Sequence, residues 1–253
     1  KVDEDSGPVL QAKSALVMDQ VSGVVLWQKE PDLVLPIASI SKLMTAVVAR
    51  DMIENWDETY TLQWSEVALG GSTFSAGVGD TFSKGDLLKS ALVGSVNSAA
   101  AAVAHSTGLA EADFVAVMNT TADTLGLLNT TYVEPTGLSA NNTSTARDVA
   151  LLLRTVSADP LLMEPLSQAE HRLMNGDQEM IVKTTNRLVK NDDPYVFAGK
   201  TGFTYEAGHC LAAFAKDADN HQIIVVVLGA PDEDSRFAET AELAQWTFDH
   251  YRW

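Results

Sequence analysis

Residues 36–45 of the chain are Pro36-Ile37-Ala38-Ser39-Ile40-Ser41-Lys42-Leu43-Met44-Thr45. From here apolar residues recur at the spacing of a helix with one buried face, at Ile40, Leu43, Met44, Val47 and Val48. Pro36 indicates the start, because its fixed φ and missing N–H are tolerated only at or before the first turn of a helix. We therefore expect a central buried helix that starts at about Pro36 and ends at about Ile53.

Ser39 and Lys42 stand three residues apart, so on a helix their side chains share a face and can touch. A serine beside a lysine suits nucleophilic catalysis in which the amine is the base, provided that the amine is neutral near pH 7. A helix N-terminus disfavours a cation and so lowers the pKa of a lysine there. The alternative is that Ser39 caps the helix and Lys42 is a solvated charge, which is the more common meaning of an isolated S-x-x-K.

The composition excludes several classes of protein. With 253 residues, of which 46% are hydrophobic, the chain is globular and long enough for one large domain or two lobes. It has 17 basic and 34 acidic residues, a formal net charge of -17. Because a phosphate-binding surface needs a basic stripe, we expect no nucleic-acid partner. Adhesion to anionic lipid is disfavoured by the same sign of charge.

Targeting and metal signals are weak. No run approaches the roughly 20 apolar residues of a membrane helix, so we expect no transmembrane segment. The chain does not begin with a basic segment followed by an apolar one, so it is either cytosolic or begins after a removed signal. Cys210 is the only cysteine, which leaves the redox compartment undefined. The five histidines form no H-x-x-x-H or H-E-x-x-H pair, so neither a metal nor a cofactor is expected.

The order of elements along the chain indicates an α+β fold. Short apolar runs at residues 14–18 and 24–27 predict a hairpin, and residues 56–82 predict short strands and loops. Helical spacing predicts four helices after the central one, at residues 83–94, 97–104, 111–126 and 146–156. The character then changes, with strand candidates at residues 179–182, 195–198, 210–215 and 223–228. The last of these is so apolar that it should be central and buried on both faces. Residues 235–251 predict a final helix.

These elements predict one antiparallel sheet flanked by terminal helices, with the helical middle of the chain as a second lobe. We expect residues 1–12 to be a mobile N-terminal segment and residues 13–253 to form a single domain. The sheet lobe would contain about residues 13–35 and 165–253, and the helical lobe about residues 55–164. A groove between the lobes is the expected place for a site.

Three short motifs fall in order along the chain: Ser39-x-x-Lys42, Ser95-x-Asn97 and Lys200-Thr201-Gly202. S-x-x-K and K-T-G each occur once, whereas S-x-N occurs at Ser95 and again at Ser139. Ser95 is the better candidate because it lies at a helix junction, and the residues around Ser139 are explained by turn chemistry. Together and in this order the motifs resemble the penicillin-binding and active-site serine D,D-peptidase superfamily.

Longer matches narrow the resemblance to the low-molecular-mass D-alanyl-D-alanine peptidases, and within them to the penicillin-binding protein 7 type endopeptidases. They are found in residues 31–45, the loop Glu134-Pro135-Thr136-Gly137-Leu138-Ser139, residues 144–148, residues 199–204 and residues 207–211. One departure is Val96, which stands where related enzymes often have a polar or small residue. The resemblance implies a β-lactamase/transpeptidase-like fold in which residues 13–253 are the catalytic domain.

The resemblance also implies roles for the motif residues. Ser39 would be the nucleophile that forms an acyl-enzyme, Lys42 its base, and Ser95 the relay that returns the proton to the leaving amine. Lys42 would be held neutral by burial, by the helix dipole and by the charge of Lys200. The backbone N–H groups of Ser39 and Phe203 would form the oxyanion hole.

The remaining motif residues would bind the substrate. Asn97 would hydrogen-bond the substrate peptide or fix Lys42. Lys200 would add positive potential, and Thr201 would bind the substrate's terminal carboxylate. Gly202 would let the substrate backbone approach the strand closely. Residues 199–204 should be an edge strand along which an extended peptide adds.

The implied function is hydrolysis of D-alanyl bonds in peptidoglycan in the periplasm, with endopeptidase action on cross-links favoured. Its partners would be peptidoglycan peptide stems, with β-lactams as covalent inhibitors. The alternatives are a D-alanyl-D-alanine carboxypeptidase, a β-lactamase, or a wall-binding module without turnover. A β-lactamase is disfavoured because neither Glu134 nor Glu164 is followed four residues on by Asn, so both are expected to be structural or solvated. His209 and Cys210 are expected to pack in the core rather than to form a dyad.

Overall fold

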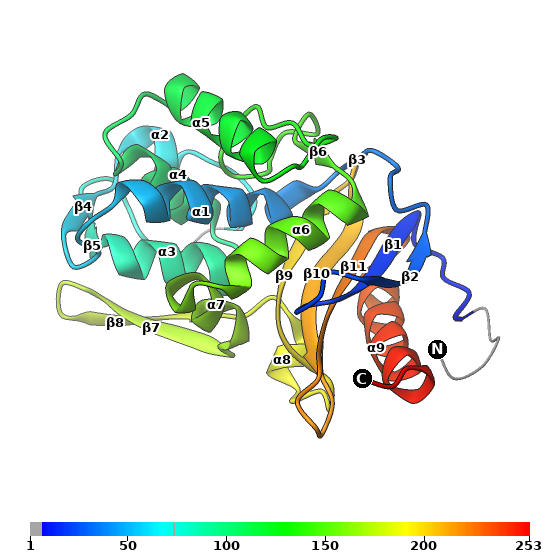
Figure 1. Cartoon of the computed structure of the whole chain (residues 1–253). Helices are drawn as coiled ribbons and strands as arrows, with labels where there is room; N and C mark the ends of the chain where they lie inside the picture. The colour runs from blue at the N-terminus through cyan, green and yellow to red at the C-terminus, as the bar shows by residue number, and fades with distance from the viewer. Residues whose placement is uncertain (1–6, 73) are drawn as a thin grey trace.

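A computed structural model describes residues 7–72 and 74–253. Its main sheet is antiparallel and has the strand order β2-β1-β11-β10-β9 (Figure 1). The strands are β1 (Ser14–Asp19), β2 (Val25–Lys29), β9 (Val196–Thr204), β10 (Gly208–Lys216) and β11 (Gln222–Ala230). The most apolar strand, β11, lies between β1 and β10, with Leu16 opposite Val226 and Ala213 opposite Val225. Its predicted central position is therefore confirmed, and β9 is at the edge of the sheet.

The two faces of the sheet are buried by different helices because successive side chains of a strand point to opposite faces. Val225 and Val227 pack in a cluster with Phe237 and Leu243 of α9 (Glu233–His250). Side chains of the alternate register pack against α6 (Ala146–Ser157) on the other face (Figure 1). The second covering helix thus comes from the middle of the chain, whereas the sequence predicted terminal helices.

Most of the remaining helices build the second lobe (Figure 1). Their bounds are η1 (Ala38–Ser41, a 3₁₀ turn), α1 (Lys42–Met52), α2 (Trp64–Val67), α3 (Lys84–Val93), α4 (Asn97–His105), α5 (Glu111–Thr124) and α7 (Pro160–Ser167). Short strand pairs accompany them, β3 (Leu35–Pro36) with β6 (Thr143–Ser144) and β4 (Thr59–Thr61) with β5 (Thr81–Ser83). Ser83 caps α3 as predicted, since its side chain accepts from the Asp86 N–H. Within residues 7–72 and 74–253, no helix has both the length and the apolar character to cross a bilayer.

The central helix is buried as predicted but begins later than Pro36. Pro36 lies in β3, and Ala38 has a φ of 48°, which is incompatible with a continuous helix. The 3₁₀ turn η1 follows, and α1 begins at Lys42. Ser39 therefore lies on the turn that leads into α1, and Lys42 is the first residue of the helix itself.

Residues 170–183 pack differently from the prediction. The expected strand at 179–182 exists, but β7 (Glu170–Asn175) and β8 (Gln178–Lys183) form a separate two-stranded sheet. This hairpin packs against α3 of the helical lobe, so the predicted boundary of the sheet lobe at residue 165 is wrong. A strand pattern in sequence predicts that a strand exists, but it does not specify the strand that pairs with it.

The predicted mobile segment, residues 1–12, is contradicted by the structure at residues 10–12. Residues 1–6 lie outside the described residues. Leu10 and Ala12 are buried, and the N–H groups of Gln11 and Ala12 donate to the Glu239 carboxylate at 2.6 and 3.1 Å. The Lys29 ammonium donates to the carbonyls of Leu10 and Ala12, each at 2.8 Å. Residues 10–12 are therefore fixed to the sheet lobe.

Candidate active site

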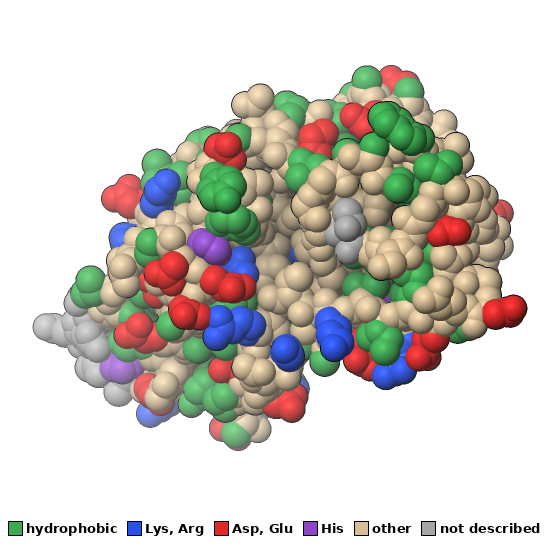
Figure 2. Space-filling view, turned by 180° about the vertical axis from the view of Figure 1, so that it is seen from behind, with side chains coloured by type: hydrophobic (Ala, Val, Ile, Leu, Met, Phe, Trp, Pro, Cys, Tyr) green, Lys and Arg blue, Asp and Glu red, His purple; other side chains and the backbone are tan. Residues whose placement is uncertain are grey.

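A cavity of about 480 Å³ lies where the edge strand β9 meets η1 and the α3–α4 junction. The predicted residues that line it are Ser39, Ser95, Asn97, Thr201, Gly202 and Phe203. Lys42 and Lys200 are fully buried behind this lining and reach it through their ammonium groups. Figure 2 shows the molecule hollowed on this face, with Lys and Arg side chains beside the hollow. The three motifs are thus brought together at one place.

The Lys42 amine lies in contact with Ser39. Its Nζ donates to Ser39 Oγ at 2.9 Å, to Asn97 Oδ1 at 2.7 Å and to the Thr136 carbonyl at 2.6 Å. Only 1% of Lys42 is exposed, whereas Ser39 is partly exposed to the cavity. The alternative in which Lys42 is a solvated charge is therefore wrong, because the amine is buried away from water and its hydrogen bonds go to three protein groups.

Burial lowers the pKa of the Lys42 ammonium from 10.5 to about 7. The negative charge of Glu134 opposes this effect and favours the charged form. The sequence predicted that the pKa of Lys42 would be lowered, and it gave burial, the helix dipole and the charge of Lys200 as the causes. In the structure, burial is the dominant cause. A buried amine with a pKa near 7 is often neutral at neutral pH and can then take a proton from a hydroxyl.

Lys200 holds the second serine. Its Nζ donates to Ser95 Oγ at 2.7 Å and to the Thr201 carbonyl at 3.0 Å. Burial lowers the pKa of Lys200 well below 10.5, and the positive charges of Lys42 and Arg236 lower it further. Two ammonium groups are costly in one buried site, so a charge on one lysine disfavours a charge on the other. Ser95 itself has a φ of 59°, a conformation rarely adopted by residues other than glycine and typical of functional sites.

Asn97 fixes Lys42, which was one of its two predicted roles. Its Oδ1 accepts from Lys42, and its Nδ2 donates to the Gly70 carbonyl at 2.6 Å. The Asn97 N–H also donates to the Ser72 carbonyl at 2.8 Å. The side chain therefore joins the loop at residues 70–72 to the buried lysine.

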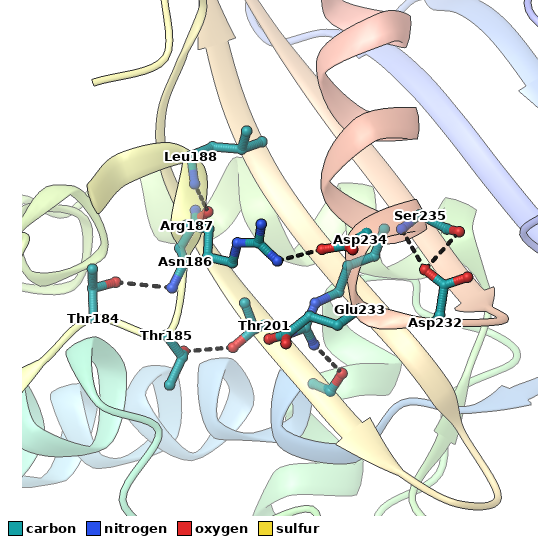
Figure 3. A network of polar contacts seen from close by, with 12 residues as sticks. Thr184, Thr185, Asn186, Arg187, Leu188, Thr201, Asp232, Glu233, Asp234 and Ser235 are labelled. Carbon is teal, nitrogen blue, oxygen red and sulfur yellow. Dashed lines mark hydrogen bonds and ion pairs between the residues drawn. The ribbon is translucent and has the colours of Figure 1, made fainter. Parts of the chain in front are cut away.

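The K-T-G motif lies on the edge strand β9, as predicted. Thr201 Oγ1 is 2.5 Å from Thr185 Oγ1 (Figure 3). The structure gives Gly202 a packing role beside the predicted role in substrate binding. A Cβ on Gly202 would lie 2.8 Å from the Ile37 carbonyl oxygen, so the glycine permits close packing of β9 against the segment before Ser39. The close approach is to the chain's own backbone.

Phe203 is 46% exposed at the cleft, and its ring stacks on His209 with 4.3 Å between ring centroids. Cys210 is fully buried on the opposite face of β10. The two neighbours form no dyad, but the expectation of core packing holds for Cys210 alone. His209 supports the exposed Phe203 ring.

Several groups at the site are not part of the three sequence motifs. The Thr136 carbonyl contacts Lys42, and a backbone group carries no side-chain signal. Arg236 is buried and donates to the Gly202 carbonyl at 3.1 Å, so it holds the K-T-G strand from α9. Figure 3 shows the neighbouring pair in which Arg187 of α8 (Arg187–Lys190) donates to Asp234. Only the match of the Glu134–Ser139 loop to the resembled family could have indicated the first of these groups.

Glu134 is structural, as predicted, and it holds a loop that contacts the site. One carboxylate oxygen accepts from the Thr136 N–H at 2.6 Å, and the other accepts from the Gly137 N–H at 2.6 Å and from Asn142 Nδ2 at 3.1 Å. These bonds fix the carbonyl that Lys42 contacts. Glu164 is exposed on α7 and accepts from Gln168. Neither glutamate presents a free carboxylate of the kind a β-lactamase would use for deacylation.

Residues 1–232 match the family described as D-alanyl-D-alanine carboxypeptidase. The chain belongs to this family. It is 40% identical over 240 residues to a D-alanyl-D-alanine endopeptidase of Pseudomonas aeruginosa, and the alignment covers 94% of this chain and 77% of the relative. It is 36% identical over 244 residues to a D-alanyl-D-alanine endopeptidase of Escherichia coli, and this alignment covers 95% of this chain and 78% of the relative. The predicted resemblance to the D-alanyl-D-alanine peptidases and the predicted class, a serine-type peptidase, are confirmed.

Solved structures of other D,D-peptidases have the same fold as this family member. A variant of the Streptomyces K15 DD-transpeptidase is 25% identical, with a TM-score of 0.90 over 96% of this chain and 99% of the other. Penicillin-binding protein D2 of Listeria monocytogenes, in its cefotaxime-bound form, is 30% identical, with a TM-score of 0.84 over 96% and 99% of the two chains. The predicted transpeptidase-like α+β fold is confirmed.

Proposed function

We propose that this chain hydrolyses D-alanyl peptide bonds of peptidoglycan through an acyl-enzyme on Ser39, with residues 13–253 as the catalytic domain. The observation that carries the proposal is the 2.9 Å contact between Lys42 Nζ and Ser39 Oγ, in a place where burial brings the pKa of the amine to about 7. When Lys42 is neutral, its two N–H groups donate to Asn97 and Thr136 and its lone pair faces Ser39, so it takes the hydroxyl proton as Ser39 Oγ attacks the substrate carbonyl. The N–H groups of Ser39 and Phe203 stabilise the resulting oxyanion.

Collapse of the tetrahedral intermediate breaks the peptide C–N bond. Ser95 passes a proton to the leaving amine and is reprotonated by the Lys42 ammonium, and Lys200, 2.7 Å from Ser95 Oγ, supplies positive potential. A water molecule then attacks the ester carbonyl and gives a proton to neutral Lys42. As the ester C–O bond breaks, Lys42 returns this proton to Ser39 Oγ, and the free enzyme is restored. Asn97, Lys200, Thr201, Gly202 and Phe203 bind the substrate. Its carboxylate lies at Thr201, where the negative charge raises the pKa of Lys200 and favours its charged form.

Endopeptidase action on cross-links is the favoured activity, because the relatives at 40% and 36% identity are named endopeptidases. The cefotaxime-bound relative at 30% identity supports covalent inhibition by β-lactams at Ser39. Peptidoglycan as substrate implies action in the periplasm and a part in maintaining cell shape.

The function is tested by incubating the purified protein with muropeptides and analysing the products by mass spectrometry. We expect cross-linked dimers to be converted to monomers. Release of D-alanine from pentapeptides without loss of dimers would replace the endopeptidase by a carboxypeptidase. Absence of both reactions, together with no covalent adduct of benzylpenicillin, would leave a wall-binding module.

The rate of acylation by benzylpenicillin is expected to depend on pH through Lys42. Because the neutral amine is the reactive form and the pKa is about 7, the second-order rate constant should be level above that pH. Below it the rate constant should fall by about tenfold per pH unit. Stopped-flow acylation between pH 5.5 and 9 measures the profile. A rate constant that does not change over this range would exclude Lys42 as the base.

Replacement of Glu134 by glutamine is expected to move the acid limb of that profile to lower pH. Loss of the negative charge removes the effect that raises the pKa of Lys42, so less of the amine is protonated at a given pH. The plateau rate should also fall, because an amide NH₂ group facing the loop N–H groups disturbs the Thr136 carbonyl. Glu164→Gln, on the exposed surface of α7, is the matched control. An acid limb at the wild-type pH would show that Glu134 does not act on Lys42.

A further inference from the structure

A second hollow of about 460 Å³ lies beside the active-site cavity. Ser72 and Thr185 line both, so the two hollows adjoin at these residues. The whole of β8, from Gln178 to Lys183, lines the second hollow, and Phe74, Ser75 and Val96 line its other side. The mechanism above uses none of these residues.

The strand that borders this hollow has a free edge. Among the described residues β8 pairs only with β7, with Val182 opposite His171 and Met180 opposite Leu173. The backbone groups on the other edge of β8 therefore have no strand partner. A free edge that borders a groove is the feature to which an extended peptide adds as a further strand. Six residues of strand span roughly 20 Å, which is sufficient for several backbone hydrogen bonds.

The hairpin is held firmly beside the reactive serines. His171 Nε2 lies 2.9 Å from Asp86 of α3, and Asn175 Nδ2 donates to Asp80 at 2.8 Å. Val182 packs so closely on Gly94 that a Cβ at Gly94 would lie 2.2 Å from Val182 Cγ1. Because Gly94 directly precedes Ser95, the position of β8 is fixed relative to the S-x-N motif.

Thr185 connects the hollow to the K-T-G strand. Its Oγ1 lies 2.5 Å from Thr201 Oγ1, and its N–H donates to the Val93 carbonyl at 3.3 Å (Figure 3). Under the proposed function, the residue that leaves with the freed amine has its carboxylate at Thr201. A leaving group longer than one residue continues from Thr201 past Thr185 and meets the free edge of β8.

We propose that the hollow along β8 binds the second peptide stem of a cross-linked substrate, the stem that leaves with the freed amine. The proposal rests on the proposed function and adds a subsite to it. A single D-alanine, the leaving group of a carboxypeptidase reaction, ends at Thr201 and does not enter the hollow. Because the second stem is joined to the first through the bond that is cleaved, binding of the first stem at Ser39 places the second stem beside this groove. The hollow therefore gives specificity for cross-links without taking part in acylation.

Filling the hollow tests this inference. Ser75 is exposed and lines the hollow without lining the active-site cavity, so Ser75→Trp obstructs the one and leaves the other open. We expect kcat/KM for cross-linked dimer to fall at least about tenfold, mainly through a higher KM. Acylation by benzylpenicillin and D-alanine release from monomeric pentapeptide should each change less than about twofold. Ser167→Trp, exposed at the end of α7, controls for the added surface tryptophan.

A second obstructing variant is Gln178→Trp, at the turn end of β8, which should give the same selective loss if the first variant folds poorly. Dimer cleavage unchanged in both variants, or an equal loss for dimer, pentapeptide and benzylpenicillin, would overturn the subsite. A wild-type protein that benzylpenicillin does not acylate would overturn the proposed function itself. The two failures are therefore distinguishable.

Discussion

Replacement of Ser39 by alanine is expected to abolish covalent labelling by benzylpenicillin and cleavage of cross-linked muropeptides. The Ser39 Oγ is the atom that forms the acyl bond, and its base lies 2.9 Å away. Loss of the nucleophile of a serine hydrolase costs about six orders of magnitude in turnover. Intact-protein mass spectrometry after incubation with benzylpenicillin measures the adduct directly.

Ser41→Ala is the matched control for this variant. Ser41 lies two residues further on but is fully buried, and its Oγ donates to the Ala38 carbonyl at 2.8 Å and accepts from Asn142 at 3.0 Å. It should keep the adduct, although loss of two buried hydrogen bonds lowers stability by about 1–3 kcal/mol. An adduct that persists in Ser39→Ala would place the nucleophile elsewhere and remove the basis of the proposed mechanism.

The parts of the site that sequence predicted are those set by short-range rules. Three residues of helical spacing bring Ser39 and Lys42 together, and the K-T-G run lies on the edge strand β9 that its resemblance implied. The cause of the pKa shift of Lys42 was harder to predict. Burial depends on every element packed around the amine, whereas a helix terminus can be read from the local sequence.

The parts that sequence missed depend on the pairing of distant segments. The hairpin β7–β8 has a strand pattern, but its packing on α3 comes from His171 and Asp86, which are far apart in the chain. The carbonyl of Thr136 is likewise placed by the fold of its loop. Backbone groups of this kind are the same for every residue type, so no motif identifies them.

The net charge of -17 conceals the local charge of the cleft. Its lining includes three cations, Arg187, Lys190 and Arg236, with Glu233 as the one acidic residue of the described lining. A cleft that gathers positive charge within an acidic protein attracts an anionic ligand to one place. The net charge of the whole chain therefore does not give the sign of the charge at the site.

Replacement of Lys42 by methionine is expected to lower the rate of acylation by benzylpenicillin by about two to four orders of magnitude while the protein stays folded. The chain of methionine is similar in length and apolar, so it fills the buried space left by the lysine stem. What is lost is the group that removes the proton from Ser39. Lys13→Met, on the exposed surface, is the control and should acylate at the wild-type rate.

The same variant reports on stability through the sign of the pKa shift. The pKa of Lys42 is lowered from 10.5 to about 7, so between these values the unfolded chain binds a proton that the folded protein does not. Stability of the wild type therefore rises with pH across this window and is lost as the pH falls toward the folded pKa. The methionine has no ammonium to bury. Its melting temperature relative to the wild type should accordingly be higher at pH 6 than at pH 9, and a difference that is the same at both pH values would show that Lys42 is not the titrating group.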